Sequence, residues 1–542
     1  MSFRTGRTWR GVAIVTAALA LVAGTVSVLQ TTASARMGAP YASCAAGTTV
    51  TTADGPVCGT VSSGVAEWLG IPYAAPPVGA LRWKPPQPPA RWTATLHATS
   101  FGSECVQQLP GLAGGSEDCL YLNVWAPQGT DEGANLPVLV HIHPGAFIYG
   151  NGNTDYSLLA AQGNEVIVSI NYRLGILGFL ADPALGPNSG DYGLEDQQAA
   201  LRWVQQNAPA FGGNPGNVTI FGESAGASSL CDDIASPTAA GLFERGISTS
   251  GQYNSLTGAP TGAEAQDCKS ALPPQGQAEA AGAGFAAAVG CGSAADVVAC
   301  MRAVPAQTAA QASGLGYQDG GTGTVAPTIN PTILPRSLRQ ALEVGRVNRV
   351  TLISGTDRDE NITGTATTPA QYTQLIQAQY GKYASRVVAL YPLSHFDSPG
   401  IAYRTVTADS DTVCPSLVTD RELSRLMPVY AYEIDDYDIP PYAPGAVGTA
   451  QGASHVGAWY LNPQTPALDA NQQALQDEEV ASVAHFAATG NPNTTGTPYW
   501  PQFGPSGSEM ILAPAGDSAA TSIAPIAAIH KCGFWDSIAP AA

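Results

Sequence analysis

Apolar segments separated by helical patterns recur along the chain and indicate its fold class. Runs of apolar and β-branched residues at Leu136–Ile142, Val166–Asn171 and Val218–Phe221 predict buried strands. Between the last two, Leu194–Asn207 carries apolar residues at helical spacing and ends before Phe211-Gly-Gly, a stop signal. This alternation predicts an α/β protein with a mostly parallel, doubly wound central sheet flanked by helices.

Further segments extend the pattern at both ends. Val61–Tyr73 predicts an opening hairpin, and Leu120–Trp125, Arg349–Ile353 and Val429–Ile434 predict additional strands. Thr261–Leu315 is rich in Ala and Gln and predicts helices that are inserted as a cap. Neither a repeat nor a linker divides the sequence, so we expect one folded domain after the N-terminal segment.

The first 35 residues have the pattern of a secretory signal. Three arginines among the first ten residues precede an apolar run, Gly11–Val22, and Ala33-Ser34-Ala35 follows as an A-x-A cleavage site. We expect cleavage after Ala35, which leaves residues 36–542 as the mature domain of an extracellular protein without stable membrane insertion. The alternative is that the apolar run is retained as a membrane anchor.

Composition narrows the partners that the chain can have. The 542 residues are 44% hydrophobic and 12% charged, and the net charge is −19. This charge argues against binding to nucleic acid or to an anionic membrane surface, because both attract basic proteins. We interpret the acidity as keeping an exported protein in solution. A small molecule remains as the expected partner.

Ten cysteines in an exported chain predict disulfides. Close spacing suggests small loops that join Cys44 to Cys58, Cys105 to Cys119, and Cys291 to Cys300. A metal site is the alternative, but the paired C-x-x-C spacing and neighbouring histidines of such sites are missing from the sequence. We therefore expect no metal.

Gly222-Glu223-Ser224-Ala225-Gly226 follows a predicted strand and precedes a run of small residues that can start a helix. A serine on a sharp strand-to-helix turn, with glycine two positions before and after it, is typical of the nucleophile elbow of α/β-hydrolases. Glycine is needed at both positions because a Cβ there would collide with the neighbouring strand or helix. Ser224 is therefore the candidate nucleophile.

A serine nucleophile needs a histidine base, which in this fold follows the serine and the acid along the chain. The histidines downstream of Ser224 are His395, His455, His485 and His530. His455 lies in a segment of small residues from which a base can project toward a pocket, although a solvated loop histidine is the alternative interpretation. His485 lies in a helical pattern and is expected to be structural.

The acid of the triad must lie between the serine and the base. Asp357, Asp359 and Glu360 follow the predicted strand Arg349–Ile353, and ligand sites in open parallel sheets form at the carboxyl ends of the strands. A solvated turn is the alternative, and composition does not choose among the three carboxylates.

Backbone donors for an oxyanion are also expected. His141-Ile-His-Pro-Gly-Ala-Phe147 follows a predicted strand and supplies N–H groups at the position of the HGGG-type loop of α/β-hydrolases. Loss of one such donor typically lowers the rate by about 10²–10³, which makes this loop nearly as informative as the triad.

Several long motifs in this order resemble the type-B carboxylesterase/lipase family. The motifs are Gly70-Ile-Pro-Tyr-Ala-Ala-Pro-Pro-Val-Gly79, Ser116-Glu-Asp-Cys-Leu-Tyr-Leu-Asn-Val124 and Phe211-Gly-Gly-Asn-Pro-Gly-Asn-Val-Thr-Ile-Phe-Gly-Glu-Ser224-Ala-Gly226. The likeness runs from about Val61 to Trp535. It implies the α/β-hydrolase fold, with helical cap insertions, and hydrolysis of carboxylic esters without a cofactor.

The resemblance also implies roles for individual residues. Ser224 would be the nucleophile, Glu360 the acid of the family's Asp-Glu-Gly motif, and His455 the base of its Gly-x-x-His-Gly motif. The oxyanion donors would be the N–H groups of Gly145, Ala146 and Ala225. Glu223 and Ser250 would lie next to the triad and support it.

The resemblance supports two of the disulfides suggested by spacing, Cys105–Cys119 and Cys291–Cys300, and adds Cys414–Cys532. The four remaining cysteines then leave Cys44–Cys58 and Cys231–Cys268. The segment between Cys105 and Cys119 lacks the aromatic residue that a quaternary ammonium site would need, so cholinesterase activity is not expected.

Three substitutions depart from the family pattern. Pro144 replaces the first glycine of the oxyanion loop and stiffens the loop, at a position that is not an expected donor. Asn361 replaces the glycine after the acid, where Asn tolerates a positive φ. Val456 replaces the glycine after the base and crowds the mouth of the site.

The sequence thus predicts a secreted, monomeric serine carboxylesterase. A lipase or sterol esterase for long-chain esters is the alternative within hydrolases, and would need a large apolar tunnel or a lid. A catalytically silent binding protein on the same fold is the alternative from another class, although the candidate serine, acid and base are all present.

Overall fold

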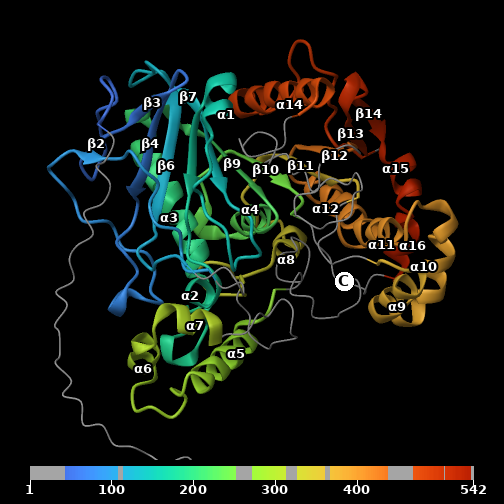
Figure 1. Ribbon diagram of the computed structural model, residues 1–542, viewed down its shortest axis with the longest axis horizontal. Helices are drawn as coiled ribbons and strands as arrows, with labels where there is room; N and C mark the ends of the chain where they lie inside the picture. Colours follow the sequence, from blue (N-terminus) through green and yellow to red (C-terminus); the bar gives the residue numbers. More distant parts are fainter. Residues whose placement is uncertain are drawn as a thin grey trace, which may run out of the picture. The chain divides into compact units, whose positions relative to one another are not determined.

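The computed structural model describes residues 43–107, 114–251, 272–312, 326–359, 366–436, 468–505 and 507–538. Within these residues, eleven strands form one mixed sheet in the order β14-β13-β12-β11-β10-β9-β7-β8-β6-β4-β3 (Figure 1). The strands are β3 (Thr60–Ser62), β4 (Val65–Pro72), β6 (Tyr121–Pro127), β7 (Leu136–Ile142), β8 (Val166–Ile170), β9 (Gly213–Glu223), β10 (Arg245–Thr249), β11 (Thr351–Asp357), β12 (Val429–Ile434), β13 (Ser508–Leu512) and β14 (Ala519–Ser522). A second, three-stranded sheet joins β1 (Val50–Thr51), β2 (Pro56–Cys58) and β5 (Leu96–His97).

The centre of the large sheet is parallel, from β8 through β7, β9, β10, β11 and β12 to β13. Antiparallel strands complete both edges: β6, β4 and β3 beside β8, and β14 beside β13. Parallel strands in register end at one edge, so the loops after β7, β9, β10 and β11 meet there. This edge carries the candidate site.

In the central strands, the side chains that point to one face of the sheet and those that point to the other are both apolar, so both faces are covered. In β7, Val138 and Val140 belong to one core cluster, whereas Leu139 belongs to the other. Helices α3 (Tyr192–Asn207), α4 (Ala225–Ala235) and α12 (Cys414–Leu423) pack on one face, and α1 (Ser157–Gly163) and α14 (Ala470–Thr489) pack together on the other (Figure 1).

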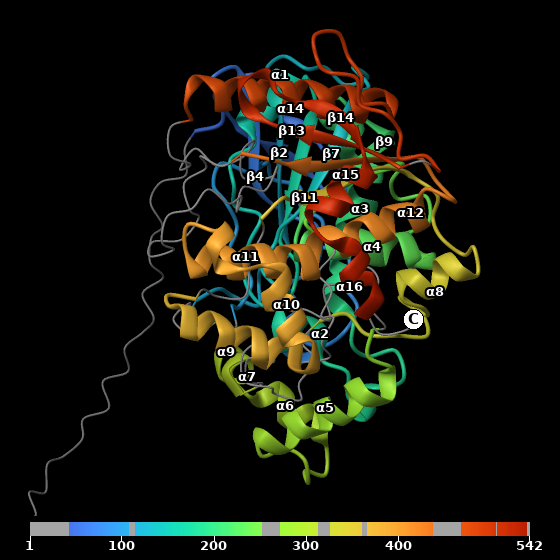
Figure 2. The same ribbon diagram turned by 90° about the vertical axis from the view of Figure 1, so that its right-hand side faces the viewer.

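Three helices form a separate group next to α2 (Gly175–Phe179) in both views (Figures 1 and 2). These are α5 (Gln275–Ala288), α6 (Val297–Ala303) and α7 (Ala306–Ala312). Their buried residues, including Phe285 and Met301, join a third core cluster with Trp83 and Leu177. This group corresponds to the described part of the predicted helical cap.

The other α-helices of the described residues belong to the C-terminal half of the chain. They are α8 (Leu338–Glu343), α9 (Pro369–Tyr380), α10 (Ala384–Leu390), α11 (Pro399–Ala408), α15 (Ile523–Ile529) and α16 (Cys532–Ile538). A π-helical turn, η8 (Asp409–Val413), joins α11 to α12. In the part of the chain that the structure describes, no helix combines the length and apolar character that a membrane crossing requires.

The predicted α/β class and its mostly parallel sheet are confirmed. Strands β7 and β12 have the predicted bounds, and β9 begins five residues earlier than the predicted strand Val218–Phe221. One detail differs at β11, because Asp357 is the last residue of that strand and fully buried rather than part of the turn after it.

Candidate active site

Ser224 lies between β9 and α4 in a backbone conformation that few residues other than glycine adopt. Its φ is 54° and its ψ is −120°, in the left-handed half of the backbone map. Two hydrogen bonds hold this peptide in place: the Ser224 N–H donates to the Thr249 carbonyl at 3.0 Å, and the Ser224 carbonyl accepts from the Ser228 N–H at 2.8 Å. Strain maintained in this way is a recurrent property of functional residues.

The two glycines of the elbow have distinct steric reasons. A Cβ on Gly222 would lie 2.6 Å from the carbonyl carbon of Gly226, and a Cβ on Gly226 would lie 2.0 Å from the carbonyl oxygen of Ile142. Real carbon and oxygen atoms do not approach so closely. Gly222 therefore allows α4 to turn back close to strand β9, which precedes it. Gly226 allows α4 to start directly against β7.

The three expected oxyanion donors lie around this contact. Gly145 and Ala146 follow β7, whose last residue Ile142 pairs with Gly222 of β9, and Ala225 is the first residue of α4. An N–H in the first turn of a helix has no partner within that helix. Within the described residues, the N–H groups of Gly145 and Ala146 have no backbone carbonyl as partner, as is expected of amides that bind a substrate oxygen.

Glu223 and Ser250, which the resemblance implies as support for the triad, also lie beside the elbow. Glu223 pairs in register with Thr249 at the ends of β9 and β10. Ser250 follows β10 with a φ of 48°, is buried, and donates its N–H to the Gly355 carbonyl at 2.8 Å. The structure thus brings Glu223 and Ser250 to the same strand ends as Ser224.

The expected acid and base, Glu360 and His455, lie outside the described residues, so their positions stay predictions. The two other carboxylates of the acidic turn are described. Asp357 is buried, and Asp359 accepts a hydrogen bond from the Thr405 hydroxyl at 3.1 Å. Burial raises the pKa of Asp359 to about 6.

Other histidines downstream of the serine have structural surroundings. His485 lies in α14, and its Nδ1 is 2.7 Å from the Asn491 carbonyl oxygen, in line with the structural role expected for it. His530 is buried between the carboxylates of Asp409 and Glu433. Neither arrangement resembles a base that faces a pocket.

Sequence reasoning missed the aromatic and histidine side chains buried at the end of β7. His143 stacks on Tyr172, the second residue after β8, with ring centroids 4.3 Å apart. Burial lowers the pKa of His143 to about 4 and that of His141 to about 3, so both rings are neutral near pH 7. The signal that could have found Tyr172 is its place in Asn171-Tyr172-Arg173, directly after a strand that neighbours β7.

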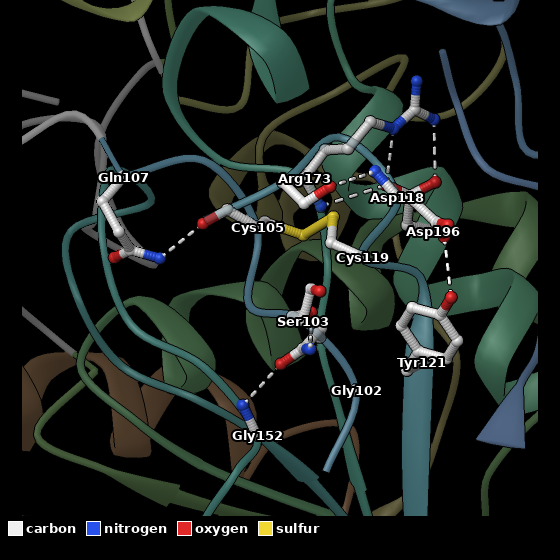
Figure 3. The surroundings of a disulfide bond; sticks show 12 residues. Gly102, Ser103, Cys105, Gln107, Asp118, Cys119, Tyr121, Gly152, Arg173 and Asp196 are labelled. Atoms are coloured by element: carbon white, nitrogen blue, oxygen red, sulfur yellow. Dashed lines mark hydrogen bonds and ion pairs between the residues drawn. A yellow bond between two sulfur atoms is a disulfide. The ribbon is translucent and has the colours of Figure 1, made fainter. Parts of the chain in front are cut away.

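Four of the five expected disulfides are bonded in the structure: Cys44–Cys58, Cys105–Cys119, Cys291–Cys300 and Cys414–Cys532. For the fifth, Cys231 is described but Cys268 lies outside the described residues. Figure 3 shows the Cys105–Cys119 bond beside the ion pair between Arg173 and Asp196.

One group of potential metal ligands occurs among the described residues, namely Cys44, Cys58 and His97. The two sulfur atoms are bonded to each other, and a disulfide does not provide the thiolates that a transition metal binds. This group therefore does not fit a metal centre.

A strained serine at a strand-to-helix turn, at the carboxyl edge of a mostly parallel sheet and beside the Gly145–Ala146 loop, defines an α/β-hydrolase. Residues 46–524 match the model of the carboxylesterase family, so the chain belongs to the type-B carboxylesterase family and is a carboxylic ester hydrolase.

Individual relatives agree with this assignment. The chain is 34% identical to the para-nitrobenzyl esterase of Bacillus subtilis (strain 168) over 496 residues, which cover 85% of this chain and 94% of that relative. A fumonisin B1 esterase of Sphingopyxis macrogoltabida is 48% identical over 200 residues, 34% of this chain and 37% of that relative.

Solved structures share the fold over nearly the whole chain. A PNB esterase superposes with a TM-score of 0.72 and 31% identity, covering 89% of this chain and 99% of its own. The carboxylesterase EST55 of Geobacillus stearothermophilus, solved at pH 6.2, superposes with a TM-score of 0.73 and 29% identity over 91% and 100% of the two chains.

Proposed function

We propose that this esterase is a secreted serine hydrolase that works through a Ser224–His455–Glu360 triad and an acyl-enzyme. Glu360 orients His455, which removes the proton of Ser224 as its hydroxyl attacks the ester carbonyl. The N–H groups of Gly145, Ala146 and Ala225 stabilise the resulting oxyanion. The alcohol leaves with a proton from His455, and water then releases the acid.

The observation that carries this proposal is the strained conformation of Ser224. A non-glycine residue at φ 54° and ψ −120° is strained, and such strain persists mainly where function requires the conformation. Here the strained residue lies between Gly222 and Gly226, where neighbouring backbone leaves no room for a Cβ. A structural serine at this turn would not require such an arrangement.

Removal of the hydroxyl tests the proposal. Ser224→Ala is expected to lower kcat on p-nitrophenyl butyrate by at least about 10⁴-fold with the fold intact, whereas Ser157→Ala in α1 is the matched control and stays near wild type. An organophosphonate should label Ser224 in the wild-type enzyme, as read by peptide mass spectrometry. Turnover that survives in Ser224→Ala would reject Ser224 as the nucleophile.

The acid and the base need their own test, because they lie outside the described residues. Glu360→Gln and His455→Ala should each lower kcat by about 10³-fold or more, whereas Asp359→Asn should retain most of the activity per active site. If Asp359→Asn were as impaired as a triad variant and Glu360→Gln were active, the acid would be assigned to Asp359 instead.

Secretion is part of the same proposal. Residues 1–35 would be the signal peptide and 36–542 the mature hydrolase, and the disulfides of the structure support folding in an oxidising compartment. Intact-mass analysis of protein from the culture medium should give a chain that starts at Arg36. A cell-bound protein with the full N-terminus would contradict cleavage.

Chain-length preference distinguishes a carboxylesterase from a lipase. Nothing in the described residues indicates the apolar tunnel that long acyl chains require. Turnover of p-nitrophenyl acetate and butyrate should therefore exceed that of the palmitate ester, without activation by an emulsion. Interfacial activation on long-chain esters would favour the lipase alternative.

A further inference from the structure

The oxyanion loop is held by contacts to its carbonyl groups. The carbonyl of one residue and the N–H of the next belong to the same planar, trans peptide group and point in opposite directions. A hydrogen bond that fixes the Pro144 carbonyl therefore also fixes the Gly145 N–H, and one that fixes the Gly145 carbonyl fixes the Ala146 N–H.

Both carbonyls have partners in the structure. The Gly145 carbonyl accepts from the N–H groups of Ile148 and Tyr149, at 2.9 and 3.0 Å, within the turn itself. The Pro144 carbonyl instead depends on a side chain, because the His143 Nδ1 lies 2.7 Å from it. A carbonyl oxygen can only accept, so Nδ1 carries the proton.

The His143 ring is in turn held by Tyr172. The two rings are nearly parallel, with an interplanar angle of 19° and centroids 4.3 Å apart, and the Tyr172 hydroxyl donates to the His143 carbonyl at 3.0 Å. A Cβ on Gly150 would lie 2.5 Å from the His143 Nδ1, so the other side of the hydrogen bond is closed by backbone. His143 is 1% exposed.

We propose that His143 and Tyr172 are positioning residues for the oxyanion hole: the imidazole of His143, stacked on Tyr172, holds the peptide plane that presents the Gly145 N–H to the substrate. The inference rests on the proposed function, since it takes Gly145 as an oxyanion donor. The arrangement also explains why proline is tolerated at position 144. It uses only the carbonyl of that residue, and proline retains its carbonyl.

The test compares two buried histidines of one segment. His143→Phe keeps a ring against Tyr172 but removes the donor to Pro144. His141→Phe is the matched control, since His141 bonds Tyr156 (Nδ1 to Oη, 2.6 Å) and contacts the Phe221 ring rather than the loop. The readouts are kcat and KM on p-nitrophenyl butyrate, with kcat expressed per phosphonate-titrated Ser224, and the Ki of a trifluoromethyl ketone.

A displaced oxyanion donor affects the transition state and not the ground state. We expect His143→Phe to lower kcat by about 10- to 100-fold, less than the loss of a whole donor, with KM within about twofold and the ketone Ki raised in parallel. Tyr172→Phe, which loses only the hydroxyl, should show a smaller change in the same direction. His141→Phe should lower the melting temperature without changing Ki.

Two outcomes would overturn the positioning role. The first is that His143→Phe has an unchanged kcat per titrated site and an unchanged Ki, whatever its stability. The second applies if His143→Phe does not fold, and it is an unaltered ketone Ki in Tyr172→Phe. Stoichiometric phosphonate labelling of Ser224 in the wild-type enzyme separates these results from a failure of the proposed function, which would leave that serine unlabelled.

Discussion

His530 and Asp409 form a buried ion pair, with the imidazole Nδ1 2.5 Å from a carboxylate oxygen. On the other side of the ring, Nε2 lies 3.0 Å from a carboxylate oxygen of Glu433. Asp409 and Glu433 raise the pKa of His530 well above its usual value, against the opposing effect of burial. The cation thus joins the C-terminal helices to the turn η8 and to strand β12.

Replacement of His530 by glutamine should strongly destabilise the protein. The variant would leave two buried carboxylates without their cation, and breaking a buried pair in this way costs about 3–5 kcal/mol. Urea unfolding of the purified enzyme measures the change. His485→Gln is the control, because that histidine is only partly buried and contacts the Asn491 carbonyl rather than a carboxylate, and it should cost no more than about 1.5 kcal/mol. Equal stabilities of the two variants would contradict the ion-pair role.

A single methyl group on Gly226 should strongly lower both the stability and the activity of the enzyme. In Gly226→Ala the new Cβ would lie 2.0 Å from the Ile142 carbonyl oxygen, and backbone cannot rotate away as a side chain can. We expect a loss of about 1–3 kcal/mol from overpacking and a fall in kcat of about 100-fold, because α4 and the oxyanion loop are pushed apart.

Gly284→Ala is the counterpart of that variant. Gly284 lies inside α5 and a Cβ there meets no atom within 4 Å. Alanine should therefore stabilise this helix by up to about 1 kcal/mol, with unchanged turnover. Thermal unfolding and p-nitrophenyl butyrate turnover of both variants check the pair, and a tolerated Gly226→Ala would show that the elbow can yield.

The ion pair between Arg173 and Asp196 gives a further test. Arg173 donates from Nε and Nη2 to the two carboxylate oxygens, each at 2.7 Å, and both side chains are buried. Arg173→Met should cost about 3–5 kcal/mol, because it strands a buried carboxylate, and the double variant Arg173→Met, Asp196→Leu should recover much of that loss. Additive losses in chemical unfolding would contradict the paired geometry.

Stability should decline as the pH rises from about 6 to about 8. Burial raises the pKa of Asp191 to about 8 and the pKa values of Glu195, Asp233 and Asp420 to about 7. The folded state therefore keeps protons that the unfolded chain has released, and this contribution is lost as the pH passes through the raised values.

The neutral histidines of the β7 end act in the opposite sense, but at lower pH. Their pKa values are lowered, so the unfolded chain binds protons that the folded state does not, and stability is lost below about pH 6.5. Above that pH the buried carboxylates and His530, whose pKa is also raised, act in the same direction, and each net proton corresponds to about 1.4 kcal/mol per pH unit. Calorimetry over this range should show a falling melting temperature, and a flat or rising one would refute the assignment.

The sequence predicts the parallel centre of the sheet well, because buried strands need unbroken apolar runs such as Leu136–Ile142. The last strands were not predicted, since Ser508–Leu512 alternates weakly and Ala519–Ser522 is mostly exposed. Neither carries the apolar pattern on which a prediction depends. An edge strand is formed by its neighbour more than by its own residues.

The elbow was predictable because its glycines and serine lie close together along the chain. The stack of His143 on Tyr172 was not, since it joins residues that follow two different strands. The acidic composition was interpreted as a means of staying in solution, yet carboxylates such as Asp191, Asp233 and Glu509 are buried. Composition does not distinguish an internal aspartate from an exposed one, because their difference lies in tertiary surroundings.

The Cys414–Cys532 disulfide joins positions 118 residues apart, and the proposed base His455 lies between them. A protease that cuts the backbone once anywhere inside this span would produce two polypeptides that migrate as one on a non-reducing gel. Only a reductant would separate them. A cut between Cys414 and His455 would therefore not dissociate the fragment that carries the proposed base from the fragment that carries Ser224.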